Sequence, residues 1–173
     1  MPIKDKSQKI CCSKSGQRMY ISNWQGGLTM YIALIAEDNK KELMAQFCIA
    51  YAGILCKHKL CATHITGKYI SDATGLEIET LLAGYYGGTD QISSMVSFNE
   101  IDMVFYFRST ESARTPEESE LNLLRLCDVY NIPLATNIAT AEALVTALDA
   151  GNLSWRDFIN PRSEYNLKKK GKL

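Results

Sequence analysis

The stretch AGYYGGTDQ, residues 83–91, contains residue types that can hold a negatively charged group. A glycine turn that opens into a helix leaves backbone N–H groups free, and these groups converge on an anion. The same composition is also typical of a simple turn. The stretch therefore predicts either an anion site or a plain connection, and the rest of the sequence must distinguish them.

Four further polar segments offer related chemistry. They supply hydroxyl groups, glycines and carboxylates, and Lys41 adds a cation one turn into an expected helix. Hydroxyl, N–H and ammonium groups are the donors that bind phosphate. Taken singly, each residue is explained by a turn or a cap, but together they predict a phosphate pocket. The segments are 36–38, 63–67, 108–110 and 136–137.

These segments follow strand-like runs. Apolar stretches predict strands at 31–36, 59–63, 78–83, 101–107 and 132–136, and helical periodicity lies at 39–56, 89–98, 117–130 and 139–149. Strands that alternate with helices predict an α/β fold with a mostly parallel sheet. In such a sheet the carboxyl ends of the strands form one edge, where ligands bind. The polar segments are expected at that edge.

The composition predicts one domain with charged extensions. The chain has 173 residues, is 46% hydrophobic and carries no formal net charge, which suits a single core. Residues 1–30 and 161–173 each carry +4, so the body between them carries −8. We expect a basic extension at 1–29, a folded domain at 30–157 and a basic tail at 158–173. The acidic body argues against nucleic-acid binding, and the apolar runs are too short for a membrane span.

The six cysteines show no spacing typical of a disulfide framework, which favours a reducing cytoplasm. Cys56, His58, Cys61 and His64 have side chains that bind zinc. A strand over 59–63, however, would hold His58 and His64 roughly 20 Å apart. We therefore expect core thiols, no metal site and no cofactor.

Three longer stretches resemble a known family, the methylglyoxal synthases. They are IALIAEDNKK, CATHITGKYISDATGLEIETLLAGYYGGTDQ and LLRLCDVYNIPLATNIATAEALV, and the similarity runs without gaps from about residue 31 to residue 157. The resemblance implies a doubly wound α/β domain that assembles into a homo-oligomer, a hexamer in this family. It also implies a reaction in which dihydroxyacetone phosphate loses a proton beside its carbonyl group and then expels phosphate. The same fold also serves binding domains, so the fold alone does not establish activity.

The resemblance implies that the phosphate-binding part of the site is present. Lys41, Thr63, Thr66, Gly67 and Gly84 stand at the positions where the family pattern requires them. The full set of predicted ligand-binding residues is Lys41, Thr63, His64, Ile65, Thr66, Gly67, Gly84, Tyr85, Tyr86, Gly87, Gly88 and Thr89.

The acid–base groups that the family uses match this sequence less well. Thr89 stands at the position of the catalytic carboxylate, Pro116 at that of a histidine and Ser119 at that of a later aspartate. These side chains cannot transfer protons near neutral pH. Asp90 follows Thr89, but one residue along a helix turns the side chain by about 100°. If the chain is active, the predicted catalytic residues are Asp90, Asp38 and Glu37.

We therefore predict a catalytically inactive binding protein for a phosphate-bearing small molecule, with a nucleotide as the favoured class, that senses or sequesters its ligand. Tyr85 and Tyr86 would either stack on a base or pack against a neighbouring subunit. The alternative is an active methylglyoxal synthase that converts dihydroxyacetone phosphate to methylglyoxal and phosphate.

Overall fold

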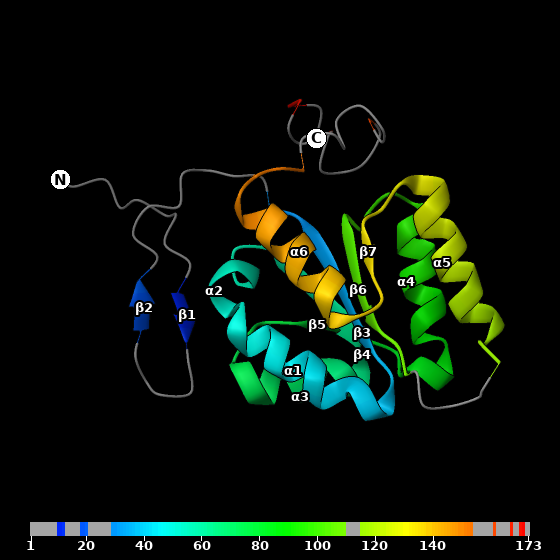
Figure 1. Cartoon of the computed structure of the whole chain (residues 1–173), viewed down its shortest axis with the longest axis horizontal. Coiled ribbons are helices and arrows are strands. Elements are labelled where there is room, and N and C mark those ends of the chain that lie inside the picture. Colours follow the sequence, from blue (N-terminus) through cyan, green and yellow to red (C-terminus); the bar gives the residue numbers. More distant parts are fainter. Residues whose placement is uncertain are drawn as a thin grey trace.

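A parallel sheet forms the centre of the molecule (Figure 1). The computed structural model describes residues 10–12, 18–20, 29–109 and 115–153, together with residues 161, 167, 170 and 171. The five strands of the sheet are β3 (Tyr31–Ala36), β4 (Lys59–Thr63), β5 (Glu79–Leu81), β6 (Met103–Phe107) and β7 (Leu134–Ala135).

The strand order places the start of the domain at the middle of the sheet. The order is β5-β4-β3-β6-β7, and every neighbouring pair is parallel. The chain therefore runs from β3 through β4 to β5 at one edge of the sheet, crosses back to β6 beside β3, and ends at β7 on the other edge. The reversal lies between β3 and β6, and an open α/β sheet binds its ligands beside such a reversal.

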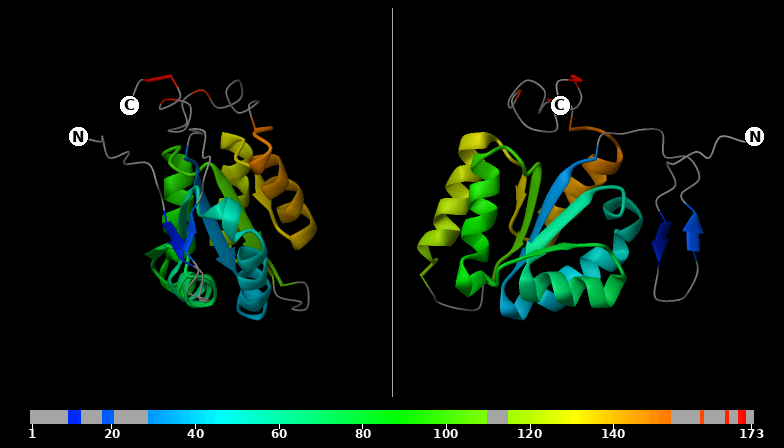
Figure 2. Two further views of the ribbon diagram at one scale, coloured as in Figure 1. Left: turned by 90° about the vertical axis from the view of Figure 1, so that its left-hand side faces the viewer. Right: turned by 180° about the vertical axis from the view of Figure 1, so that it is seen from behind.

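Helices cover both faces of the sheet (Figure 2). The helices α4 (Gly88–Ser97) and α5 (Glu118–Tyr130) pack together on one face. The other face is covered by α1 (Lys41–Ala50), α2 (Ala52–Leu55), α3 (His64–Thr74) and α6 (Ile138–Asp149). Within the described part of the chain, no helix has both the length and the apolar surface needed to cross a membrane.

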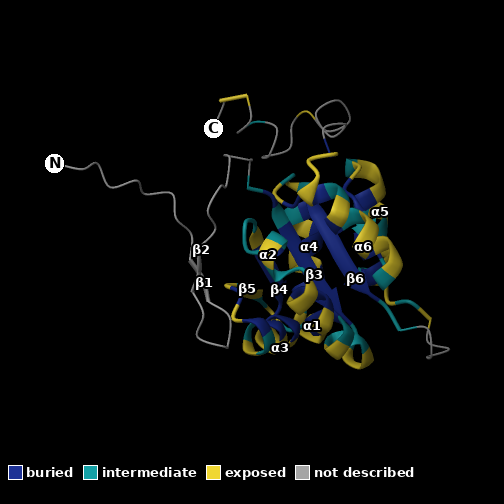
Figure 3. Ribbon diagram, turned by 60° about the vertical axis from the view of Figure 1, so that its left-hand side comes forward, coloured by how far each residue is buried: buried dark blue, intermediate teal, exposed yellow. Residues whose placement is uncertain are grey.

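The alternation of side chains along the strands divides the core in two. Ile32 and Leu34 of β3 pack with α1 and α6, whereas Ala33 and Ile35 pack with α4 and α5. The central strands are therefore buried on both faces, as the continuous apolar runs predict, and Figure 3 shows them as the buried centre of the molecule. The same alternation directs Tyr106 of β6 toward the α4–α5 face.

The predicted α/β fold is confirmed, with differences at the level of single elements. The expected helix at 39–56 is divided into a short 3-10 helix η1 (Asp38–Lys40), then α1 and α2. The sequence prediction missed α3, because its first turn contains β-branched Ile65 and Thr66 and then a glycine, which are poor helix formers. The glycine stretch forms a second 3-10 helix, η2 (Gly84–Tyr86), immediately before α4.

Part of the predicted N-terminal extension forms a small hairpin. The strands β1 (Ile10–Cys12) and β2 (Arg18–Tyr20) pair antiparallel, with Ile10 opposite Tyr20. The rest of residues 1–28, and most of the predicted tail at 158–173, lie outside the described residues.

Gly88 allows α4 to begin directly against the end of β5. A Cβ atom at Gly88 would lie 2.1 Å from the backbone oxygen of Leu82. We predict that Gly88→Ala lowers the free energy of unfolding by about 2 kcal/mol or more, because a backbone atom must move to admit the methyl group. Gly53→Ala is the control, since no atom lies within 4 Å of its Cβ position, and there alanine should stabilise α2 slightly. Equal effects of the two substitutions in thermal unfolding would contradict this account.

Candidate active site

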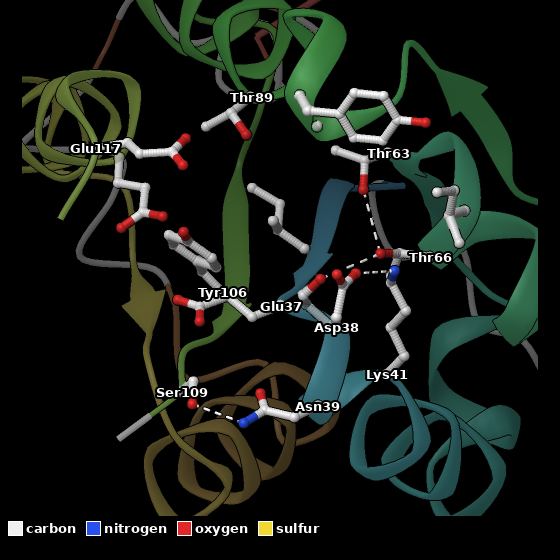
Figure 4. Close-up of a pocket in the computed structure, with 16 residues that line it drawn as sticks. Glu37, Asp38, Asn39, Lys41, Thr63, Thr66, Thr89, Tyr106, Ser109 and Glu117 are labelled. Carbon is white, nitrogen blue, oxygen red and sulfur yellow. Dashed lines mark hydrogen bonds and ion pairs between the residues drawn. The ribbon is translucent and has the colours of Figure 1, made fainter. Parts of the chain in front are cut away.

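A cavity of about 390 Å³ opens at the carboxyl ends of β3, β4 and β6. It therefore lies beside the reversal of strand order, at the edge where the sequence predicts a site. Figure 4 shows the lining residues. They are Ile35, Ala36, Glu37, Asp38, Asn39, Lys41, Thr63, Ile65, Thr66, Gly84, Tyr85, Thr89, Tyr106, Ser109, Glu117 and Glu120.

One side of the cavity carries hydrogen-bond donors. Thr63 ends β4 and Thr66 lies in the first turn of α3, and their hydroxyl groups lie 3.2 Å apart. The hydroxyl of Thr66 also donates to the backbone oxygen of Ala36 at 3.4 Å, which ties α3 to the end of β3. No side chain caps α3, an eleven-residue helix, and the N–H of its first residue, His64, donates to the oxygen of Leu82 at 3.3 Å. The N–H groups that follow in the first turn lie at the positive end of the helix dipole. This side suits a phosphate group.

Lys41 supplies the cation on the same side. It is the first residue of α1, and its ammonium group forms an ion pair with Asp38. The Asp38 side chain is 97% exposed, so water screens this pair strongly. An incoming phosphate can therefore compete for the ammonium group at small cost. Figure 4 shows Asp38 turned toward Lys41 and Thr66.

The opposite side of the cavity carries carboxylates and a phenol (Figure 4). Glu37 follows β3, and Glu117 and Glu120 lie at the start of α5. The phenol of Tyr106 hydrogen-bonds with Glu120. Burial of its ring raises the pKa of Tyr106 far above the ordinary value, and the negative charge of Glu120 raises that pKa further, so the phenol stays protonated at any physiological pH. Tyr106 is therefore a permanent hydrogen-bond donor on the carboxylate side.

Two hydrogen bonds join the segments that follow β3 and β6. The side-chain amide of Asn39 donates to the hydroxyl of Ser109 at 2.7 Å, which links the segment after β3 to the segment after β6. The backbone N–H of Glu37 also donates to the oxygen of Phe107 at 3.1 Å. Both contacts continue the β3–β6 pairing past the ends of the strands, and they fix Glu37 relative to Tyr106.

The structure brings nine of the predicted site residues to the cavity wall. These are Glu37, Asp38, Lys41, Thr63, Ile65, Thr66, Gly84, Tyr85 and Thr89. The other six are not among the lining residues, namely His64, Gly67, Tyr86, Gly87, Gly88 and Asp90. Gly67 instead lets α3 approach β5, because a Cβ there would lie 2.8 Å from Thr80.

Asp90 and the two tyrosines occupy the outer surface of this region. Asp90 is exposed in the first turn of α4, where an acidic group stabilises the positive end of the helix dipole. Tyr85 and Tyr86 are 74% and 72% exposed, and their ring centroids lie 4.4 Å apart. Only Tyr85 of this pair reaches the cavity.

On the carboxylate side of the site, sequence reasoning predicted Glu37 but missed the other members. Tyr106 and Glu120 were not singled out, because one lies inside an apolar strand and the other inside a helical pattern. A signal was present in each case. Tyr106 is the single hydroxyl-bearing residue of the run MVFYF, and Glu120 is a buried acid on a helix that begins at the expected edge.

Cys48, Cys61 and Cys127 lie in the core, where burial raises the pKa of each thiol to about 12, whereas Cys56 is only partly buried. His58 accepts a hydrogen bond from the backbone N–H of Met30 through Nδ1, at 3.3 Å. Among the described residues, no three His, Cys, Asp or Glu side chains are grouped so that they could hold a metal ion.

Proteins of similar sequence include enzymes from several bacteria. Methylglyoxal synthase of Caldicellulosiruptor saccharolyticus is 58% identical over 138 residues, which cover 79% of this chain and 97% of that protein. Methylglyoxal synthase of Geobacillus thermodenitrificans is 47% identical over 135 residues, which cover 78% of this chain and 94% of that protein. The crystal structure of methylglyoxal synthase from Elizabethkingia anophelis is also similar, with a TM-score of 0.63, 35% identity and coverage of 68% of this chain and 78% of that one.

These relatives contradict the prediction of an inactive sequestering protein. Proteins named methylglyoxal synthase match most of the chain at 47% to 58% identity, which favours the alternative, an active enzyme. The physical reason for the error lies in the search for acids. The search for a carboxylate was confined to the positions of the family pattern and to Asp90 beside one of them, whereas the cavity also gains carboxylates from Glu117 and Glu120.

The family model for the MGS-like domain matches residues 44–136. This range begins in α1 and extends past β7, so it includes four of the five strands of the sheet. Together with the relatives of similar length, this match shows that the chain belongs to the methylglyoxal synthase family.

Proposed function

We propose that the protein is an active methylglyoxal synthase, which converts dihydroxyacetone phosphate to methylglyoxal and phosphate. The observation that carries the proposal is the division of the cavity into a side with phosphate-binding donors and a side with carboxylates. The similarity to proteins named methylglyoxal synthase supports the same reaction. Both chemical requirements of the reaction, an anion site and a proton acceptor, are present in one cavity.

Charge orients the substrate in this cavity. The phosphate group binds Lys41, the hydroxyl groups of Thr63 and Thr66, and the N–H groups at the start of α3. Glu37, Glu117 and Glu120 repel the phosphate from the opposite side. The phosphate therefore stays at the α1–α3 side, and the hydroxymethyl group at the other end of the three-carbon chain extends toward the carboxylates.

This orientation sets the order of bond changes. A carboxylate takes a proton from the hydroxymethyl carbon, and the electron pair of the broken C–H bond forms an enediolate with the neighbouring carbonyl. The terminal hydroxyl then becomes the aldehyde carbonyl, the former C=C electron pair forms a double bond to the phosphate-bearing carbon, and the C–O bond of that carbon breaks as phosphate leaves with the bonding pair and takes up the hydroxyl proton. The resulting enolate takes up a proton on its terminal carbon to give methylglyoxal. Donors around the phosphate stabilise the charge that develops on the leaving group.

We also propose a homo-oligomer, with six subunits as the family resemblance implies. Exposed apolar side chains beside the cavity support a subunit contact there, since such groups are common at interfaces. They are Ile65, Tyr69, Leu82, Tyr85 and Tyr86.

We further propose that residues 30–157 form the catalytic domain, flanked by extensions at 1–29 and 158–173. We also propose that the protein acts in the cytoplasm, where its free thiols remain reduced.

The purified chain is expected to release methylglyoxal and inorganic phosphate from dihydroxyacetone phosphate in a one-to-one ratio. Derivatisation of methylglyoxal and a separate phosphate assay measure the two products. Samples without protein give the rate of spontaneous breakdown. Product formation that does not exceed this rate, at substrate concentrations that stabilise the protein against heat, would contradict the proposed function.

Lys41→Ala is expected to weaken the binding of inorganic phosphate by roughly 10- to 100-fold, because hydrogen bonds to charged groups contribute about 1.5–3 kcal/mol. Isothermal titration calorimetry measures the affinity. Lys68→Ala is the control, since Lys68 is exposed on α3 and does not line the cavity. A loss of equal size in both variants would show that general charge, not this cavity, attracts the phosphate.

A further inference from the structure

Glu120 is unusual among the carboxylates of the cavity because it is buried. It lies in the first turn of α5 and is only 5% exposed, although it reaches the cavity wall. A charged side chain is rarely buried unless a specific partner compensates the loss of water. The phenol of Tyr106, itself 3% exposed, is such a partner.

The other lining carboxylates are less suited to take a proton from carbon. The Asp38 side chain is 97% exposed and pairs with Lys41 on the phosphate side. Glu117 is exposed at the start of α5, and Glu37 is only partly buried at the end of β3. A well-hydrated carboxylate must lose ordered water before it can approach a C–H bond, whereas a buried one with a fixed partner is already oriented.

Tyr106 fixes the orientation of Glu120. Its phenol has a single proton, which it donates to the Glu120 carboxylate. Because the phenol stays protonated, it acts as a donor at every pH at which the protein is folded and active. Its hydrogen bond to Glu120 therefore restricts the orientation of that side chain.

We propose that Glu120 is the general base that removes the proton from the hydroxymethyl carbon, and that Tyr106 is the residue that positions it. This inference rests on the proposed function. In the step, the proton moves from carbon to a carboxylate oxygen of Glu120, and the electron pair passes into the enediolate. Glu120 then holds the proton that the terminal carbon of the enolate requires, so one residue returns the proton later in the reaction.

Among the described residues, charged groups of both signs act on the pair. Glu37 from the end of β3 raises the pKa of Tyr106, and Arg108 from the end of β6 lowers it by a smaller amount. Glu117 adds a further carboxylate from the start of α5. The buried residues of α4, which packs against α5, are uncharged; they are Gly88, Thr89, Ile92, Ser93 and Val96.

Substitution of Glu120 tests the proposal against a matched control on the same helical turn. Glu120→Gln keeps the size of the side chain and is expected to lower kcat by roughly 10²- to 10⁴-fold, with KM and phosphate affinity changed less than threefold. Glu118 lies two residues earlier, is exposed and is not among the lining residues. Glu118→Gln should therefore leave kcat and KM unchanged. Glu120→Asp provides a second variant if the glutamine variant does not fold, and it should lose kcat through the shorter reach of its carboxylate.

Tyr106→Phe separates positioning from a purely structural role. Loss of the donor leaves the Glu120 carboxylate less well oriented, so kcat should fall by roughly 10-fold or more while KM and phosphate affinity change less than threefold. A variant that is only less stable would lose activity in proportion to its loss of folded protein, with kcat per folded molecule unchanged.

The outcomes distinguish the two proposals. Wild-type turnover together with at least a third of normal kcat in Glu120→Gln would overturn the assignment of the base and leave the proposed function standing. An unchanged kcat in folded Tyr106→Phe would overturn the positioning role. No wild-type turnover would overturn the proposed function and, with it, the assignment of Glu120.

Discussion

The parallel pairing of β3 with β6 is the constraint on which the site depends. Ile35 lies opposite Tyr106 and Ala36 opposite Phe107, and the pairing continues to a hydrogen bond between Glu37 and Phe107. Because β3 and β6 begin the two halves of the sheet, their connections diverge, and a cavity opens between α3 on one side and α5 on the other. Alternation along the strands directs Ile35 and Tyr106 to the α4–α5 face, where α5 brings Glu120.

This arrangement places the groups that bind a phosphate and the groups that accept a proton on opposite sides of one small cavity. The α1–α3 side supplies an ammonium group, hydroxyl groups and the positive end of a helix, whereas the α5 side supplies carboxylates. A phosphorylated three-carbon ketone fits this gradient in only one direction. In the proposed complex, its anion lies against the donors, and the carbon that must lose a proton lies near the proposed base.

The sequence predicts the fold and half of the site for a clear physical reason. Apolar runs such as 31–36 define strands through short-range periodicity, and the residues after them, Lys41, Thr63 and Thr66, reach the same edge because parallel strands must end together. The carboxylate side depends on packing that periodicity does not encode. The packing of α5 against α4 and β6 decides whether Glu120 faces solvent or the cavity. In the same way, the rotation of α4 about its axis decides that Asp90 lies outside the cavity.

A crystal structure with a non-reactive analogue of dihydroxyacetone phosphate tests the central claim most directly. The account predicts that the phosphate of the analogue contacts Lys41, Thr63 and Thr66, and that the carbon at its other end lies within about 3.5 Å of a Glu120 carboxylate oxygen. A phosphate bound on the α5 side, or a reacting carbon that faces solvent and contacts Asp90, would contradict it.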